Sequence, residues 1–119
     1  MVQHQVHQKF KVFTGGSIKE LSDRVRAYTA SGSVAAKSIG IEFLEQGKQL
    51  LLSLGYATGQ PGYPVTLRET TAGPLPENDE AGTLGRALEK AAVGAGDVIC
   101  HELYVDAESV VHMVFMVRN

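Results

Sequence analysis

Hydrophobic and polar positions alternate most regularly between Ile39 and Tyr56. Two extended runs flank the segment 45–48, in which Gly47 suits the positive φ angle of a tight hairpin turn. Pairing Glu45 with Lys48 places one apolar set on a single face of the hairpin: Ile39, Ile41, Phe43, Leu50, Leu52 and Leu54. The other face is mixed, and a slip by one residue would bury Glu42 and Ser53. The pattern therefore predicts a hairpin with a well-defined register.

A strand and a helix are expected before this hairpin. Residues 9–13 are rich in β-forming side chains and lead into Gly15-Gly16. Ser17 and Glu20 have the spacing of a capping box, which predicts that a helix begins after Ser17. An apolar stripe follows at helical spacing: Ile18, Leu21, Val25 and Tyr28. Gly32 suits the left-handed position that commonly ends a helix.

The second half of the chain repeats this order. Residues 65–68 predict a short strand, 69–79 an irregular Pro-rich loop, and 79–96 a helix capped by Asp79 and ended by glycine. Residues 98–105 and 110–117 predict a second hairpin. If Asp106 faces Ser109, His101 and His112 share one face, whereas Cys100, Glu102, Tyr104, Val111, Met113 and Phe115 share the other. Both faces are largely apolar.

Two β-α-β-β units, at about 9–56 and 65–118, are joined by a connector at 57–64. We interpret them as an internal repeat within a single α+β domain spanning residues 1–119. Six strands are expected in one mainly antiparallel sheet, with two helices on one face. The uncovered face would then carry an apolar patch, which includes Leu51, Val111, Met113 and Phe115. Because such a patch needs a partner, the sequence predicts a homo-oligomer, a dimer or larger, assembled sheet to sheet.

The composition narrows the class of protein. The chain has 119 residues, a formal net charge of -2 and 44% hydrophobic residues, as is ordinary for a globular domain. It has no basic cluster of the kind that binds nucleic acid, and no apolar run long enough to span a membrane. Cys100 is the only cysteine, so no disulfide forms within the chain. These features predict a cytoplasmic protein that binds neither nucleic acid nor membranes.

Candidate chemistry is limited to three places. Cys100 and His101 are neighbours in a strand and point to opposite faces, so they do not form a catalytic pair. His101 and His112 are expected to be diagonal neighbours across the hairpin, within reach of a shared ligand, and Glu102 and Tyr104 are expected to border an interface pocket.

The segment formed by Gly15, Gly16 and Ser17 precedes a helix, where an anion would be favoured. It has neither the lysine of a P-loop nor the G-x-G-x-x-G spacing, and no other motif indicates a cofactor or a metal.

These observations leave three functional hypotheses. The first is a non-enzymatic oligomer that binds a small molecule, an anionic ligand or a protein partner. The alternative is an enzyme with a site assembled between subunits around His101 and His112, with Glu102, Tyr104 and the turn at Gly15-Gly16. The third is a purely structural protein. Because many functions share one fold, the fold class alone does not choose among them.

Overall fold

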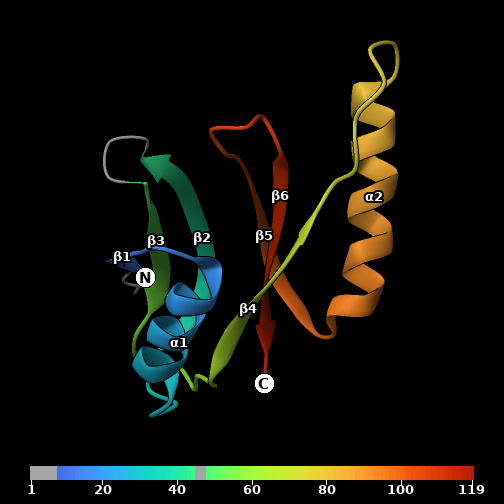
Figure 1. Cartoon of the computed structure of the whole chain (residues 1–119). Coiled ribbons are helices and arrows are strands. Elements are labelled where there is room, and N and C mark those ends of the chain that lie inside the picture. The colour runs from blue at the N-terminus through green and yellow to red at the C-terminus, as the bar shows by residue number, and fades with distance from the viewer. Residues whose placement is uncertain (1–7, 45–47) are drawn as a thin grey trace, which may run out of the picture.

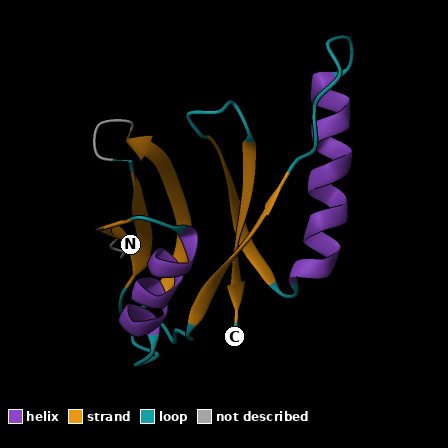
Figure 2. Ribbon diagram, in the orientation of Figure 1, coloured by secondary structure: helices purple, strands orange, loops and turns teal. Residues whose placement is uncertain are grey.

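The computed structural model describes residues 8–44 and 48–119. Figures 1 and 2 show the path of the chain and its elements. In chain order these elements are β1 (Gln8–Gly15), α1 (Ile18–Thr29), β2 (Ala35–Leu44), β3 (Gln49–Ala57), β4 (Val65–Thr71), α2 (Glu80–Ala95), β5 (Val98–Val105) and β6 (Val111–Arg118). The α+β class is confirmed. β4 extends three residues into the segment that was predicted to be an irregular loop.

The described strands form two antiparallel sheets of three strands each. Sheet A has the order β1-β3-β2 and sheet B the order β4-β6-β5, so the predicted single sheet is wrong. β2 and β5 lie side by side, and the Cys100 thiol interacts with the backbone of Ile39. Each of these two edge strands contains a register shift, between Ala36 and Ser38 and between Val98 and Cys100. Such irregularities bend a strand and interrupt its ladder, which accounts for two sheets. Both halves share one strand order, and the duplication itself stays a prediction.

Helix α1 begins after Ser17, as predicted, and ends at Thr29, shortly before the predicted end at Gly32. The Ser17 hydroxyl accepts a hydrogen bond from the Glu20 amide at 3.1 Å, and the Glu20 carboxylate accepts one from the Gly16 amide at 2.9 Å. Gly32 follows the helix with a φ of 75°, in the left-handed region. The buried positions of α1 are Ile18, Leu21, Val25 and Thr29. Thr29 extends the predicted stripe by one turn.

The register of the first hairpin is confirmed. Leu50, Leu52 and Leu54 pair with Phe43, Ile41 and Ile39, as the alternation predicted. Residues 45–47, which include Gly47 and most of the predicted turn, lie outside the described residues. We call the face of sheet A that carries Leu52 its front face.

The register of the second hairpin is wrong by one residue. Val105 pairs with Val111, and Tyr104 pairs with His112. Ser109 adopts a φ of 63°, and its amide donates to the Asp106 carbonyl at 3.1 Å. A turn that ends in a left-handed residue holds one residue more than the tight turn we expected. All β6 side chains therefore lie on the opposite face, relative to β5, from the one predicted.

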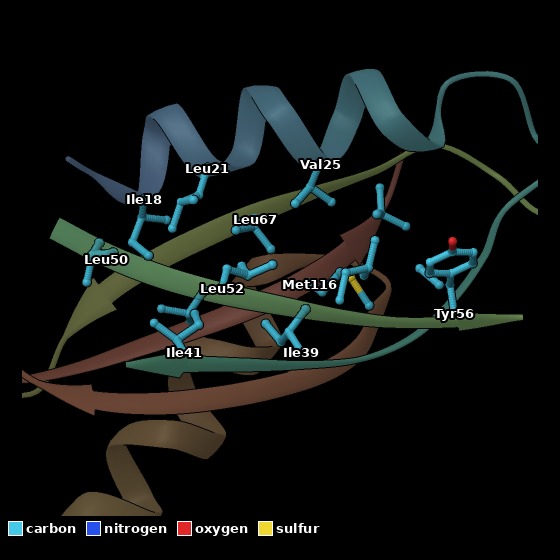
Figure 3. Packing of buried hydrophobic residues seen from close by; sticks show 14 of the residues in the cluster. Ile18, Leu21, Val25, Ile39, Ile41, Leu50, Leu52, Tyr56, Leu67 and Met116 are labelled. Carbon is cyan, nitrogen blue, oxygen red and sulfur yellow. The ribbon is translucent and has the colours of Figure 1, made fainter. Parts of the chain in front are cut away.

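The main hydrophobic cluster lies between the two sheets and is closed by α1 (Figure 3). The front face of sheet A contributes Ile39, Ile41, Leu50, Leu52, Leu54 and Tyr56. Sheet B contributes Val65, Leu67, Tyr104, Val114 and Met116, on the side that we call its back face. Neither sheet encloses this core alone, so the two halves of the chain depend on each other.

Helix α2 covers the front face of sheet B. Met113, Phe115 and Val117 are buried there, in contact with half-buried helix residues such as Leu84 and Leu88. The sequence prediction that Val111, Met113 and Phe115 form an uncovered face is wrong, because these side chains pack beneath a helix of their own chain. Ala95 is the one buried residue of α2, and the other helix residues are half-buried or exposed. The helix stands alongside sheet B, on the outside of the molecule (Figure 1).

Candidate functional site

A groove runs between α2 and the outer edge of β4. Its volume is about 650 Å³, a size typical of ligand sites. Small helix residues, Ala87, Ala91 and Gly94, form one wall, and Met113 and Phe115 lie at its base. The full lining is Arg68, Glu69, Thr70, Thr71, Ala72, Gly73, Ala87, Lys90, Ala91, Gly94, Ala95, Met113 and Phe115. Most of the opposite wall is therefore β4 and the residues after it.

The two halves of the β4 edge differ in their hydrogen bonding. The Ala72 amide donates a hydrogen bond to the Val111 carbonyl, next to the end of β4. The register therefore directs the backbone N–H and C=O groups of even-numbered β4 residues inward, toward β6. Those of odd-numbered residues point outward, away from β6. At the start of the strand, α1 satisfies the outward groups. The Val65 amide donates to the Thr29 hydroxyl at 3.1 Å, and the Leu67 amide donates to the Ser22 hydroxyl at 2.9 Å.

The outward backbone groups of Glu69 and Thr71 have no hydrogen-bond partner among the described residues. Both residues are exposed, and both line the groove. An unpaired strand edge is a template for another extended segment. The groove thus combines an open backbone edge, an apolar base and a helix wall made mostly of small residues.

Two cations line the same groove. Arg68 and Lys90 are exposed, and neither takes part in an ion pair within residues 8–44 and 48–119. Arg68 belongs to the helix-covered face of sheet B, because it pairs with Phe115 of β6. The pair, one cation on each wall, gives the groove a positive charge that suits a carboxylate.

A polar cluster lies beside the groove on the back face of sheet B. His112 Nδ1 is 3.0 Å from Glu69 Oε2, and His112 Nε2 is 2.7 Å from Asp106 Oδ2. The Tyr104 ring stacks on the His112 ring at a centroid distance of 4.3 Å, and its hydroxyl donates to Glu69 Oε2 at 2.6 Å. A carboxylate only accepts, so both imidazole contacts are hydrogen bonds when each ring nitrogen carries a proton. The cluster fixes the ring in one orientation.

Burial and hydrogen bonding change the acidity of this cluster. Burial, followed by the hydrogen bond to Glu69, raises the pKa of Tyr104. The hydrogen bond from His112, followed by the backbone amide of Val110, lowers the pKa of Asp106. Tyr104 therefore stays protonated and Asp106 stays ionised at neutral pH. The cluster ties the second hairpin to β4 through Glu69.

The structure separates the two histidines predicted to act together. His101 lies on the front face of sheet B beside Phe115, at 6.5 Å between ring centroids, and is exposed. His112 lies on the back face, so the expected diagonal pair is wrong. The cause is the extra residue in the turn at Ser109, which moved every β6 side chain to the other face. Glu102 and Tyr104 share the back face with His112, and Glu102 borders a separate hollow on the back face of sheet A.

The predicted anion site before α1 is occupied from within the chain. The Glu20 carboxylate binds the Gly16 amide, and the Ser17 hydroxyl caps the helix. The same hydrogen bond to Gly16, followed by that to Arg24, lowers the pKa of Glu20. Gly15 is buried at the end of β1. Cys100 is half-buried, and burial raises the pKa of its thiol.

Sequence reasoning missed the residues that form the groove and the cluster. Glu69, Thr70 and Thr71 were assigned to a loop, although two adjacent β-branched threonines favour a strand. Asp106 was expected only to face Ser109 across the turn of the second hairpin. No signal in the sequence indicated that Glu69 and Asp106 would meet at one histidine, because that contact depends on the pairing of β4 with β6.

No protein-family model, curated protein or solved structure matches this chain. In the part of the chain that the structure describes, no helix is both long and apolar enough to cross a bilayer. Within the same ranges, 8–44 and 48–119, no three His, Cys, Asp or Glu side chains are arranged as metal ligands.

Proposed function

We propose that this chain is a protein-interaction module that binds an extended peptide segment in the groove between α2 and β4. The observation that carries the proposal is the open edge at Glu69 and Thr71 beside an apolar groove of about 650 Å³. Adding a strand to an exposed sheet edge is a common mode of peptide recognition, in which backbone hydrogen bonds provide affinity and side-chain pockets provide specificity. The module acts by binding and needs no catalytic group.

The shape and charge of the groove specify the peptide. A segment paired with Glu69 and Thr71 would direct alternate side chains toward Met113 and Phe115, which favours apolar residues at those positions. Arg68 and Lys90 favour a carboxylate, from an acidic side chain or a C-terminus. The small wall residues leave room for a backbone to approach the helix. We also propose a cytoplasmic location, which the single cysteine, Cys100, supports.

The test uses a substitution that removes one outward amide without touching the ladder. Heptapeptides are selected from a random phage-displayed library on the full-length chain, synthesised with a fluorophore and titrated by fluorescence anisotropy. Thr71→Pro removes the outward N–H and should weaken binding by about ten-fold or more, since it also places a proline ring on the edge. Thr71→Ala is the matched control, because it keeps the amide and should bind within about two-fold of the original chain.

Charge supplies an independent check. The double variant Arg68→Gln, Lys90→Gln should weaken binding of selected acidic peptides and reduce its dependence on salt. Failure to select any peptide, or selected peptides that bind Thr71→Pro and Thr71→Ala equally, would remove the proposal. Binding that requires the two cations but ignores Thr71→Pro would indicate a small anionic ligand instead of an added strand.

A further inference from the structure

Glu69 connects the polar cluster on the back face of sheet B with the open edge of β4. Its outward backbone groups line the groove, whereas its carboxylate accepts a hydrogen bond from the Tyr104 hydroxyl at 2.6 Å and lies 3.0 Å from His112 Nδ1. Two side chains, one from β5 and one from β6, therefore hold the residue that offers its backbone to a peptide. A change in the charge of His112 acts directly on that residue.

The two carboxylates at His112 are held with different firmness. Asp106 Oδ1 accepts from the Glu108 and Val110 amides at 2.8 and 3.1 Å, and Asp106 Oδ2 lies 2.7 Å from His112 Nε2. The turn thus fixes the Asp106 carboxylate, and its contact with the ring is the shorter of the two. A neutral imidazole carries a proton on one nitrogen only. Asp106 keeps that proton on Nε2, so Nδ1 turns a lone pair toward Glu69 Oε2.

The imidazolium is the only cation that pairs with either carboxylate within residues 8–44 and 48–119. The titratable side chains that face the ring are those of Tyr104 on β5, Glu69 on β4 and Asp106 in the turn. Glu102 lies on the same face, where its carboxylate accepts from a backbone amide, and sheet A packs against this face with apolar side chains. On α1, which lies along β4, Lys19 and Asp23 are exposed and form no ion pair in the described part of the chain. Glu20 pairs with Arg24. Loss of the ring proton therefore leaves two carboxylates without a positive partner.

We infer that the proton on His112 Nδ1 controls how firmly Glu69 and the outer edge of β4 are held, so that the groove binds a peptide more tightly in mild acid than in mild alkali. His112 thus regulates the groove, and this last step rests on the proposed peptide binding. Histidine is the side chain that changes charge near neutral pH. With the ring protonated, Glu69 is fixed before a peptide arrives, which lowers the ordering cost of binding. Without that proton, Nδ1 and Glu69 Oε2 repel each other, and the peptide must order the edge itself.

The first test measures the chain alone, without a peptide. Ring-nitrogen chemical shifts of the isotope-labelled chain, recorded from about pH 5.5 to about pH 8.5, should show His112 protonated on both nitrogens in acid and on Nε2 alone in alkali. Hydrogen exchange, corrected for the intrinsic effect of pH, should show that the inward amide of Thr70 loses about ten-fold of its protection across that range. The inward amide of Thr66 is the internal control. It lies at the end of β4 that α1 holds, and its protection should change by less than about two-fold.

Glu69→Gln is the variant that separates the effect of the proton from that of packing. A glutamine side chain both donates and accepts, so it can bond to His112 Nδ1 in either protonation state. The variant should therefore keep the same protection at Thr70 in acid and in alkali. His101→Gln is the matched control. It removes the exposed histidine of the front face and should respond to pH as the original chain does.

Peptide affinity is the second readout. Selected heptapeptides without histidine, acetylated at the N-terminus, should bind the original chain and His101→Gln about three-fold or more weakly at the alkaline end of the range, and Glu69→Gln equally at both ends. Equal affinity of the original chain at both ends would overturn the inference. So would a His112 ring that does not change protonation, a neutral ring that keeps its proton on Nδ1, or a pH response that persists in Glu69→Gln. Failure to select any peptide would instead remove the proposed function, and the ring shifts and Thr70 exchange would still decide whether His112 controls the edge.

Discussion

The hydroxyl of Thr29 should be a major stabilising group, because it joins helix α1 to strand β4. Thr29 is 0% exposed; its Oγ1 donates to the Val25 carbonyl at 2.9 Å and accepts from the Val65 amide at 3.1 Å. Thr29→Val keeps the volume and removes the acceptor, which leaves the Val65 amide buried and unpaired. Such a loss costs about 1–3 kcal/mol of unfolding free energy.

The expected change in melting temperature follows from the size of the chain. An unfolding entropy of about 2.1 cal/mol/K per residue makes each kcal/mol worth about 4 °C for a chain of this length, so Thr29→Val should melt about 4–12 °C lower. Thr29→Ser tests the reason, because it keeps the hydroxyl and loses a buried methyl group. Thr66→Val is the matched control: its hydroxyl bonds to Asn119 at an exposed site. That change should stay within about 0.5 kcal/mol.

Hydrogen exchange locates the effect. The Val65 amide should lose protection in Thr29→Val and keep it in Thr29→Ser, with little change at inward amides of β4 such as that of Thr66. A melting temperature for Thr29→Val within 1 °C or so of the original chain, together with unchanged exchange at Val65, would refute the reasoning that α1 satisfies this edge.

Two further predictions concern pH and helix composition. The pKa of Asp106 is lower in the folded chain than in the unfolded chain, so the ionised carboxylate stabilises the fold. This contribution is fully present above the unfolded pKa of about 3.9. It is lost as the pH falls through the lower pKa of the folded state. Urea unfolding should therefore show that Asp106→Asn lowers the unfolding free energy at pH 6. The difference from the original chain should shrink toward zero in strong acid. An equal difference at both pH values would contradict the inference that the ionised Asp106 carboxylate stabilises the fold. Gly85 lies within α2, and a Cβ atom added there meets nothing within 4 Å. Gly85→Ala should therefore raise the unfolding free energy by about 0.4–1 kcal/mol, and a lower melting temperature would show that the helix needs the glycine.

Local patterns predicted much of the fold. The capping pair Ser17 and Glu20, the glycine after each helix and the alternation around Leu52 each depend on neighbours close in sequence. All of them agree with the structure, because short-range sterics and hydrogen bonds determine them.

The errors arose where a long-range choice decides the structure. A single left-handed residue, Ser109, changed the register of β6 and moved Met113 and Phe115 under α2. The same change separated His101 from His112 and brought His112 to Glu69. Whether β2 and β5 would pair depended on irregularities in both strands, which the alternation of side chains did not reveal. The candidate groove followed from these choices and was therefore not predicted.

The core shared by both halves has a consequence for synthesis of the chain. Strands β1 to β3 and helix α1 leave the ribosome first, yet the front face of sheet A is completed only when Val65, Leu67, Val114 and Met116 arrive from the second half. A nascent chain that stops at the connector therefore presents a bare apolar layer to solvent or to chaperones. Folding must wait for the last strand, β6, which lies at the centre of sheet B.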